Sequence, residues 1–366
     1  MKLVVFGLSV SSSWGNGHAT LWRGLIKGLH RLGHHTVFFE HDTPFYARHR
    51  DLHDVPGGQL ILYPDWEEIR RQAATQLADA DAAIVTSYCP DASAASELVL
   101  SSPTRVRCFY DLDTGVTLDR LRNGQTVDYI PAGGLADFDL VLSYTGGLAL
   151  SELKTRLGAR HIAPLYGSVD PEQHHPTAAI ERFRSDLSYL GTYAADRQRE
   201  LEELFVEPAR RHSELKFLIG GPQYPADFPW TKNIHLVPHV PPEEHPAFYC
   251  SSRLTLSVTR RPMAEMGYCP SGRLFEAAAC GAPIVSDDWD GLDYFFEPGR
   301  DILVARTTGH VMDALAMSDE ELGRIARAGR ERALAVHTAD RRALDLENIL
   351  EAAISLPVEQ AGAARE

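Results

Sequence analysis

The chain has 366 residues, a formal net charge of -14 and 44% hydrophobic residues. Its length exceeds what one hydrophobic core usually supports, which predicts two α/β domains. The negative charge disfavours a nonspecific nucleic-acid binder, because phosphate backbones require a surplus of lysine and arginine. No stretch approaches the roughly 20 uninterrupted apolar residues of a membrane helix, so we expect no transmembrane segment.

The first residues and the cysteines indicate in which cellular compartment the protein is found. The start of the chain, MKLVVFGLSVSSSWGNG, has one lysine and a short apolar run that passes into glycine and serine. That pattern is typical of a buried first strand and not of a signal peptide. Cys89, Cys108, Cys250, Cys269 and Cys280 are odd in number and lack paired spacing, which favours reduced thiols. These features predict a cytoplasmic protein without a zinc cluster.

Buried apolar runs alternate with helical patterns through the first half of the chain. Five runs predict parallel strands, and the segment from Ala19 to Leu32 predicts a helix between the first two. The runs are KLVVFGLS, TVFFE, AAIVTSY, RVRCFYDL and LVLSYT. Together they indicate one doubly wound domain over residues 1–170.

A second alternation begins after the segment HIAPLYGSVDPEQHHP, whose glycine, proline and histidine content predicts a linker. Six further runs predict a second doubly wound domain over residues 171–338. They are LSYLGTY, LKFLIGG, NIHLVPHV, RLTLSVT, APIVSD and DILVA. Helical spacing from Ser318 to Leu356 predicts closing helices. Residues 339–366 are expected to form a closing helix and tail, the last ten residues being disordered.

The segment SGRLFEAAACGAP, which begins at Ser271, places two charges in a helix otherwise suited to burial. Ser271 is the expected N-cap, Gly272 permits close backbone approach, and the helix should end at Gly281. The first N–H groups of a helix are free and its dipole is positive there, so this end, with Arg273, suits a phosphate or diphosphate. Glu276 lies one turn later, where the hydroxyls of a ribose could meet it. An Arg273–Glu276 ion pair on a solvated face fits the spacing equally well.

These residues resemble a known family. SGRLFEAAACGAPIVSDDWDGLDYFFEPGRDILVA is similar to the donor-site segment of GT-B glycosyltransferases, in the CgeB-like group related to glycosyltransferase family four. PLYGSVDPEQHHP, YLGTYAADR and VTRRPMAEMGYCPSGRLFEA are similar to other stretches of that family. The resemblance covers most of the chain and is strongest from about Asp186 to Ala305. It implies an α/β GT-B fold, in which two doubly wound Rossmann-like domains face an interdomain cleft.

The resemblance also implies an activity and its partners. The C-terminal domain would bind a nucleotide diphosphate sugar, and the N-terminal domain would bind a small-molecule or glycan acceptor. Sugar transfer to an acceptor hydroxyl would need neither metal nor cofactor. Tyr268 stands where family four has a second glutamate that faces the donor sugar, so the sugar and the retaining outcome stay open. The implied donor-binding residues, which include two glycines of the first turn, are Gly15, Gly17, Gly191, Thr192, Arg197, Arg260, Ser271, Gly272, Arg273 and Glu276.

The glycine-rich turn after the first predicted strand carries a second signal. Gly15 and Gly17 let a ligand approach the backbone before a helix that His18 opens. The segment resembles the first βαβ unit of GT-B enzymes, including inverting ones whose histidine is the catalytic base. We therefore expect His18 to accept a proton, oriented by Asp111 and Asp113 of FYDLDTG. A histidine that only caps the turn, with aspartates that satisfy loop amides, fits the same residues.

Other functions fit parts of the sequence. The D-x-D spacing of FYDLDTG is used by GT-A glycosyltransferases to hold a divalent ion, but two separate units argue against that fold, and we expect no metal site. A dinucleotide-dependent oxidoreductase is the less favoured alternative, because the first turn and Glu40 match a dinucleotide-binding fingerprint only loosely and Thr20 replaces the third glycine. A sugar-nucleotide epimerase or a noncatalytic sensor would keep the nucleotide site. Tryptophans are more often core or rim residues, but an exposed indole at Trp14, in the same loop, could stack on an acceptor. The donor nucleotide and the oligomeric state stay open.

Overall fold

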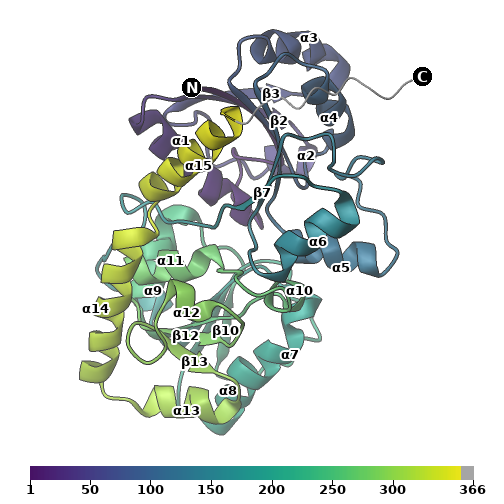
Figure 1. The fold of residues 1–366 in the computed structure, drawn as a ribbon. Helices are drawn as coiled ribbons and strands as arrows, with labels where there is room; N and C mark the ends of the chain where they lie inside the picture. The colour runs from purple at the N-terminus through teal and green to yellow at the C-terminus, as the bar shows by residue number, and fades with distance from the viewer. Residues whose placement is uncertain (356–366) are drawn as a thin grey trace.

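A computed structural model describes residues 1–355 of the chain (Figure 1). It contains a seven-stranded sheet of order β3-β2-β1-β4-β5-β6-β7 and a six-stranded sheet of order β10-β9-β8-β11-β12-β13. All paired strands within both sheets are parallel. The predicted pair of doubly wound α/β units is therefore confirmed. The expected disorder of the last ten residues lies outside the described residues.

The first sheet contains two strands that the sequence did not predict. Strand β3 has only two buried residues, Ile61 and Tyr63, and β7 has three partly exposed residues. Both lie at the edges of the sheet, where one-sided burial gives only a weak apolar signal. The predicted linker consequently begins inside the sheet. The strands are β1 (Lys2–Gly7), β2 (His35–His41), β3 (Gly58–Tyr63), β4 (Ala82–Thr86), β5 (Val106–Asp111), β6 (Leu140–Ser143) and β7 (Ile162–Pro164).

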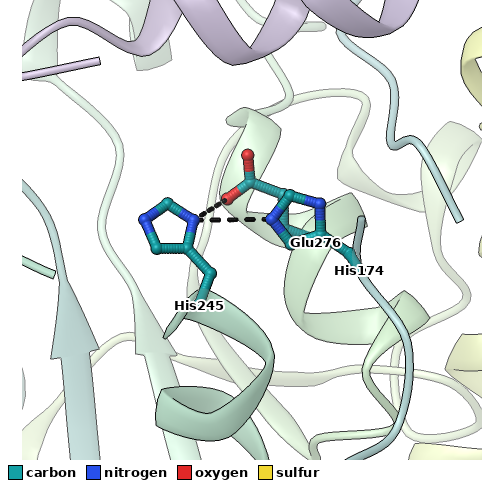
Figure 2. Close-up of side chains that lie close together, drawn as sticks. All are labelled: His174, His245 and Glu276. Carbon is teal, nitrogen blue, oxygen red and sulfur yellow. Dashed lines mark hydrogen bonds and ion pairs between the residues drawn. The ribbon is translucent and has the colours of Figure 1, made fainter. Parts of the chain in front are cut away.

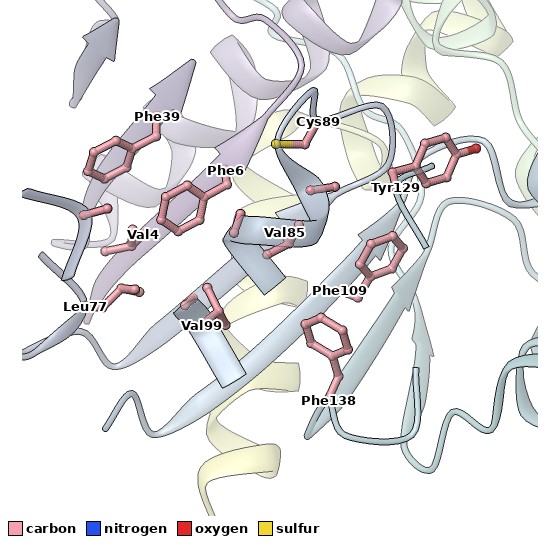
Figure 3. Close-up of a cluster of buried hydrophobic side chains, with 14 of the residues drawn as sticks. Val4, Phe6, Phe39, Leu77, Val85, Cys89, Val99, Phe109, Tyr129 and Phe138 are labelled. Atoms are coloured by element: carbon pink, nitrogen blue, oxygen red, sulfur yellow. The ribbon is translucent and has the colours of Figure 1, made fainter. Parts of the chain in front are cut away.

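An aromatic core fixes this sheet to the helices on one of its faces (Figure 3). Phe6 stacks on Phe39 with ring centroids 5.0 Å apart, and Phe109 packs against Phe138. All four are fully buried, and each such burial contributes roughly 1.5–3 kcal/mol. The core therefore holds the strand ends rigidly. The helices of this domain are α1 (Gly17–Arg31), α2 (Pro44–Ala47), α3 (Trp66–Leu77), α4 (Ala92–Leu100), α5 (Thr114–Arg122) and α6 (Leu148–Leu157).

The second sheet contains all six strands that the sequence predicted for it. They are β8 (Ser185–Leu190), β9 (Phe217–Gly220), β10 (Ile234–Val237), β11 (Ser252–Ser257), β12 (Ile284–Asp287) and β13 (Leu303–Ala305). The helical segments are η1 (Glu181–Phe183), η2 (Ala195–Arg197), α7 (Gln198–Leu201), η3 (Glu202–Val206), α8 (Glu207–Arg211), η4 (Pro242–Glu244), α9 (His245–Cys250), α10 (Arg261–Ala264), α11 (Gly272–Ala279), α12 (Leu292–Phe295), α13 (Thr308–Ala316), α14 (Asp319–Val336) and α15 (Ala339–Ile354).

The chain crosses between the two domains twice. The crossings lie side by side, because Val169 forms a parallel bridge with Thr338. Beyond the second crossing, α15 returns to the first domain and packs on α1, as Figure 1 shows in yellow and purple. A Cβ at Gly28 of α1 would lie 2.8 Å from the Ala339 carbonyl oxygen, so only glycine permits this close approach.

Among residues 1–355, no helix combines the length and the apolar character that a membrane span requires. The order of strands reverses between β1 and β4 in the first sheet and between β8 and β11 in the second. In parallel sheets, ligands bind beyond the carboxyl ends of strands at such switch points. The two switch points therefore indicate where a site should be sought.

Candidate functional site

A cavity of about 540 Å³ lies between the two domains. The first domain contributes the start of α1 and the loops that follow β4 and β5, and the second contributes the loops after β8, β9 and β11 and the start of α11. The walls are thus the carboxyl ends of parallel strands, where the topology predicts ligand binding. Every predicted site residue except Asp111 lines this cavity: Gly15, Gly17, His18, Asp113, Gly191, Thr192, Arg197, Arg260, Ser271, Gly272, Arg273 and Glu276.

Arg273, on the first turn of α11, is held across the cavity wall. Its Nη1 donates to the carbonyl oxygen of Leu190 at 3.0 Å and to the Tyr189 hydroxyl at 3.3 Å. The guanidinium also lies over the Tyr189 ring, 5.6 Å from its centroid, which is a cation–π geometry. A Cβ at Gly191 would come within 2.8 Å of Nη1. Gly191 therefore makes room for Arg273, and the intrahelical ion pair with Glu276 is not formed.

Two more guanidinium groups lie near Arg273. Arg260 pairs with Asp196 at 2.7 Å. Arg197 donates to the Thr192 carbonyl oxygen at 3.1 Å, while its buried Nε has no hydrogen-bond partner. Burial lowers the pKa of Arg197, and the charges of Arg273 and Arg260 lower it further. This end of the cavity therefore carries concentrated positive charge.

Acidic side chains balance only one of these three groups: Arg260, besides its pair with Asp196, has its Nη1 4.0 Å from Oδ1 of Asp113 in the first domain. Within residues 1–355, neither Arg197 nor Arg273 forms an ion pair with a carboxylate. Helix α11 begins beside them, and its N-cap, Ser271, makes no side-chain capping bond. Guanidinium groups at a helix N-terminus suit the oxygens of a phosphate or diphosphate.

His18 and Asp113 form a pair on the opposite wall. The Nε2 atom of His18 lies 3.0 Å from Oδ2 of Asp113, and the backbone N–H of His18 donates to the Asn16 side chain at 3.1 Å. Burial raises the pKa of Asp113, but the hydrogen bond and charge of His18, with the charges of Arg260 and Arg197, lower it below its usual range overall. The Nδ1 atom of His18 is buried without a partner. A reactant in the cavity therefore meets the histidine and the aspartate as one pair, not an open imidazole nitrogen.

Asp111 does not have the position that the sequence predicted. It is the fully buried last residue of β5, lies outside the cavity lining and makes no hydrogen bond to His18. Its Oδ1 accepts a hydrogen bond from the backbone N–H of Asp113 at 3.0 Å, and burial raises its pKa to about 6. Strand alternation turns Asp111 inward, so it supports the Asp113 backbone instead of orienting the histidine.

Glu276 is 8% exposed and is surrounded by groups that the sequence did not associate with it. The Tyr249 hydroxyl donates to its Oε2 at 3.5 Å, and Nδ1 of His245 lies 3.8 Å from the same oxygen. His174 follows at 3.4 Å from His245 (Figure 2). Burial lowers the pKa of both histidines, and the Glu276 charge opposes that shift. Only their tripeptide contexts, HHP and EHP, mark these histidines in the sequence, and no motif joins them.

Tyr268 occupies the position at which family four has a sugar-facing glutamate. Its backbone has a φ of 47°, a left-handed conformation that is unusual for a bulky residue. Its ring packs against Gly291, where a Cβ would lie 2.6 Å from it, and its carbonyl oxygen accepts from the N–H of Gly146 in the first domain. The ring lies outside the cavity lining. The side chain thus serves domain packing and leaves no carboxylate at this point.

Two side chains that the sequence offered as possible ligand contacts, Trp14 and Glu40, are already occupied. Trp14 is sandwiched between His49 and His239, with ring centroids 4.4 Å and 4.2 Å away, so both faces of its indole are already covered. Glu40 is fully buried and accepts hydrogen bonds from the hydroxyls of Ser9 and Ser11, at 2.8 Å and 2.6 Å, and from two backbone N–H groups. A carboxylate occupied in this way is not available to a dinucleotide ribose.

Comparisons with known proteins agree with this architecture. Residues 197–348 match the family model described as glycosyl transferase-like. A search of curated proteins finds no match. The sucrose-phosphate synthase structure from Thermosynechococcus elongatus is similar over 96% of this chain and 98% of that chain, with a TM-score of 0.70 and 12% identity.

Two solved complexes extend the comparison. HepE of Anabaena in complex with UDP and glucose covers 96% of this chain and 100% of its own, with a TM-score of 0.64 and 11% identity. An alpha-glucosyltransferase in complex with UDP covers the same shares, with a TM-score of 0.70 and 10% identity. At these identities the likeness concerns the fold, which is the GT-B arrangement of two Rossmann-like domains.

Proposed function

We propose that the protein is a glycosyltransferase that moves a sugar from a nucleotide diphosphate sugar to an acceptor hydroxyl. The observation that carries this proposal is the presence of two guanidinium groups, Arg197 and Arg273, without carboxylate partners in the interdomain cavity. A diphosphate supplies the missing negative charge. The family match over residues 197–348 and the UDP complexes of structurally similar proteins support the same donor class.

The donor would lie along the wall formed by the second domain. Arg197, Arg260 and Arg273 would bind the diphosphate, and Glu276 would accept hydrogen bonds from the ribose. The arginines would stabilise the charge that develops on the leaving diphosphate, so no divalent ion is needed there. Removing one such electrostatic contact typically costs ~2.7–4 kcal/mol in the transition state.

The acceptor would enter beside His18 and Asp113 on the first domain. In the proposed step the bond between the sugar carbon and the phosphate oxygen breaks, and its electron pair leaves with the nucleoside diphosphate. A bond from the acceptor oxygen to the same carbon forms, and the hydroxyl proton passes to the His18–Asp113 pair. Attack from that side would invert the configuration, whereas proton transfer to the donor phosphate would favour retention.

The finer assignments follow the same reasoning. The transferred sugar is proposed to be a hexose, and the chain is proposed to belong to the CgeB-like group related to family four, on the strength of SGRLFEA and the segments around it. A cytoplasmic location is proposed because the five cysteines of the chain are all unpaired.

A nucleotide panel tests the proposal. Thermal unfolding is measured with UDP, GDP, dTDP, CDP and NAD for the wild type, for Arg273→Met and for the control Arg261→Met, whose side chain is exposed outside the cavity. We expect one nucleoside diphosphate to stabilise the wild type and the control but not Arg273→Met. Stabilisation by NAD alone, or by no diphosphate, would remove the proposal. Conversion of the matching sugar nucleotide without an acceptor would instead show an epimerase.

A further inference from the structure

Three side chains from distant parts of the chain converge at one end of the cavity. His174 lies in the segment after β7, His245 begins α9 and Glu276 lies on the second turn of α11 (Figure 2). One nitrogen or oxygen atom of each lies within 4.8 Å of those of the other two. We propose that His174, His245 and Glu276 bind a divalent transition-metal ion of the zinc class.

The spacing of the three atoms fits such an ion. Nε2 of His174 lies 3.4 Å from Nδ1 of His245, which lies 3.8 Å from Oε2 of Glu276. Zinc–ligand bonds of ~2.0–2.2 Å in tetrahedral geometry place neighbouring ligand atoms about 3.4 Å apart. Two of the three separations are therefore within about 0.4 Å of that value, whereas the ligand atoms of His174 and Glu276, which lie within 4.8 Å of each other, would have to approach by up to about 1.4 Å.

The hydrogen bonding of His245 shows why a cation would stabilise this cluster. Its Nε2 lies 3.1 Å from the Val240 carbonyl oxygen, which can only accept a hydrogen bond. In the neutral ring the proton is therefore on Nε2, and the lone pair of Nδ1 faces the Glu276 carboxylate. Two acceptor atoms then lie close together in a buried site, which is unfavourable unless a cation separates them. An outer carbonyl that fixes the tautomer is also the usual support of a metal-bound histidine.

The other polar contacts of the cluster do not remove this conflict. If His174 carries its proton on Nε2, it can donate to His245, but its buried Nδ1 is then left without a donor. Oε2 of Glu276 still receives only the long 3.5 Å contact from the Tyr249 hydroxyl. Neither tautomer of His174 therefore satisfies all three groups, whereas an ion accepts a lone pair from each.

The ligand set selects the class of ion. Two imidazoles and one carboxylate suit Zn²⁺, Co²⁺ or Ni²⁺, whereas Mg²⁺ and Ca²⁺ prefer sets made of oxygen. His245 and Glu276 line the cavity, so a fourth position would open toward it, as in sites with three protein ligands. No metal motif marks these residues in the sequence, because the three ligands are far apart in the chain.

The metal site is compatible with the proposed donor site. Oε2 of Glu276 faces Tyr249 and His245, whereas Oε1 lies 4.0 Å from the position of a Cβ at Gly272, on the side of the α11 N-terminus. An ion on Oε2 therefore leaves Oε1 for the ribose. Only this division of the carboxylate rests on the proposed function.

Metal titration tests the inference directly. The full chain, freed of any affinity tag and stripped with a chelator, is titrated with Co²⁺ while its visible absorption is followed, and then with Zn²⁺ by calorimetry. We expect one equivalent, with the intense bands of four-coordinate Co²⁺ lost on addition of Zn²⁺. His174→Ala and His245→Ala should bind at least ~100-fold more weakly, since outer-shell changes alone cost ~10–100-fold. The control His175→Ala removes an adjacent exposed histidine and should bind normally.

Each titration result either supports or overturns the proposed metal site. Absence of stoichiometric binding by the wild type, or equal binding by His245→Ala, overturns the inference. Should His174→Ala fail to fold, as circular dichroism would show, Glu276→Gln preserves the side-chain volume and must also weaken binding. Stabilisation by UDP is measured on the same samples. Nucleotide binding without metal binding rejects only the metal site, and metal binding without any nucleotide effect rejects only the glycosyltransferase proposal.

Discussion

Arg197 offers the sharpest test of the proposed diphosphate site, because its positive charge is unfavourable in the ligand-free protein and would be favourable in the complex with the donor. In the ligand-free protein, burial and the charges of Arg273 and Arg260 disfavour its ionised form. In the complex, its charge and its unpaired Nε would be used by the donor. Replacing Arg197 with methionine keeps the aliphatic stem and removes the charge. Nucleotide affinity should therefore fall while the stability of the ligand-free protein is kept or increased.

The size of the effect follows from the contacts. A hydrogen bond to a charged group contributes ~1.5–3 kcal/mol, which corresponds to roughly 10- to 150-fold weaker nucleotide binding at ~1.4 kcal/mol per tenfold. The lost bond from Arg197 to the Thr192 carbonyl oxygen should cost little, because Thr192 lines the cavity and water can replace it. Unlike most substitutions of a buried polar group, this change should not lower the melting temperature.

Calorimetric titration of the nucleotide identified by the panel, with thermal unfolding of the ligand-free proteins, measures both quantities. Arg199→Met is the matched control, since Arg199 lies two residues later and is exposed. Equal affinity in wild type and Arg197→Met would refute the reasoning. An equal loss of nucleotide affinity in Arg199→Met would show that binding responds only to the overall positive charge of this region and not to a contact with Arg197.

Further outcomes follow from other contacts. Asp111→Asn should be more stable than wild type by up to ~3 kcal/mol at pH 8. Burial raises the pKa of Asp111 from 3.8 to about 6, so its ionisation costs stability as the pH rises through that window. Denaturant unfolding at pH 4 should show no such gap, and a gap independent of pH would contradict the assignment. Gly191→Ala should weaken nucleotide binding about 10-fold by displacing Arg273, with circular dichroism unchanged. His18→Ala and Asp113→Asn should each lower kcat by ~10²–10⁴, and undiminished turnover would exclude the pair. Mg²⁺ should leave UDP affinity unchanged in calorimetry, since the arginines neutralise the diphosphate.

Local signals in the sequence were sufficient to predict most of the fold. The six strands of the second sheet were found because each is a short apolar run bounded by turn residues. Helix α11 begins and ends within about one residue of the prediction, because Ser271 adopts the extended backbone of an N-cap residue and Gly281 adopts a φ of 73°. The edge strands β3 and β7 were missed for lack of such a signal.

Contacts between distant residues could not be predicted in this way. Helical spacing indicated Glu276 as a possible partner of Arg273. The guanidinium of Arg273 instead donates to the carbonyl oxygen of Leu190, at the end of β8. His18 meets Asp113 only because the start of α1 and the loop after β5 converge at one edge of the sheet. Spacing along a helix constrains which residues can meet, whereas topology decides which of them do.

The same topology constrains how the cavity can open. On one side the two crossings are tied together, since Val169 donates its N–H to the His337 carbonyl oxygen at 3.0 Å and accepts from the Ala339 N–H at 2.7 Å. Across the cavity, the domains touch where Trp14 stacks on His239. The domains also touch beside α10, where Gly146 and Leu148 donate their backbone N–H groups to the carbonyl oxygens of Tyr268 and Met266 at 2.9 Å and 3.0 Å. A wide separation of the domains must therefore break these hydrogen bonds as well as the aromatic contact. Because contacts of both kinds contribute only ~0.5–1.5 kcal/mol each, a small number of them can hold the cavity closed without preventing donor exchange.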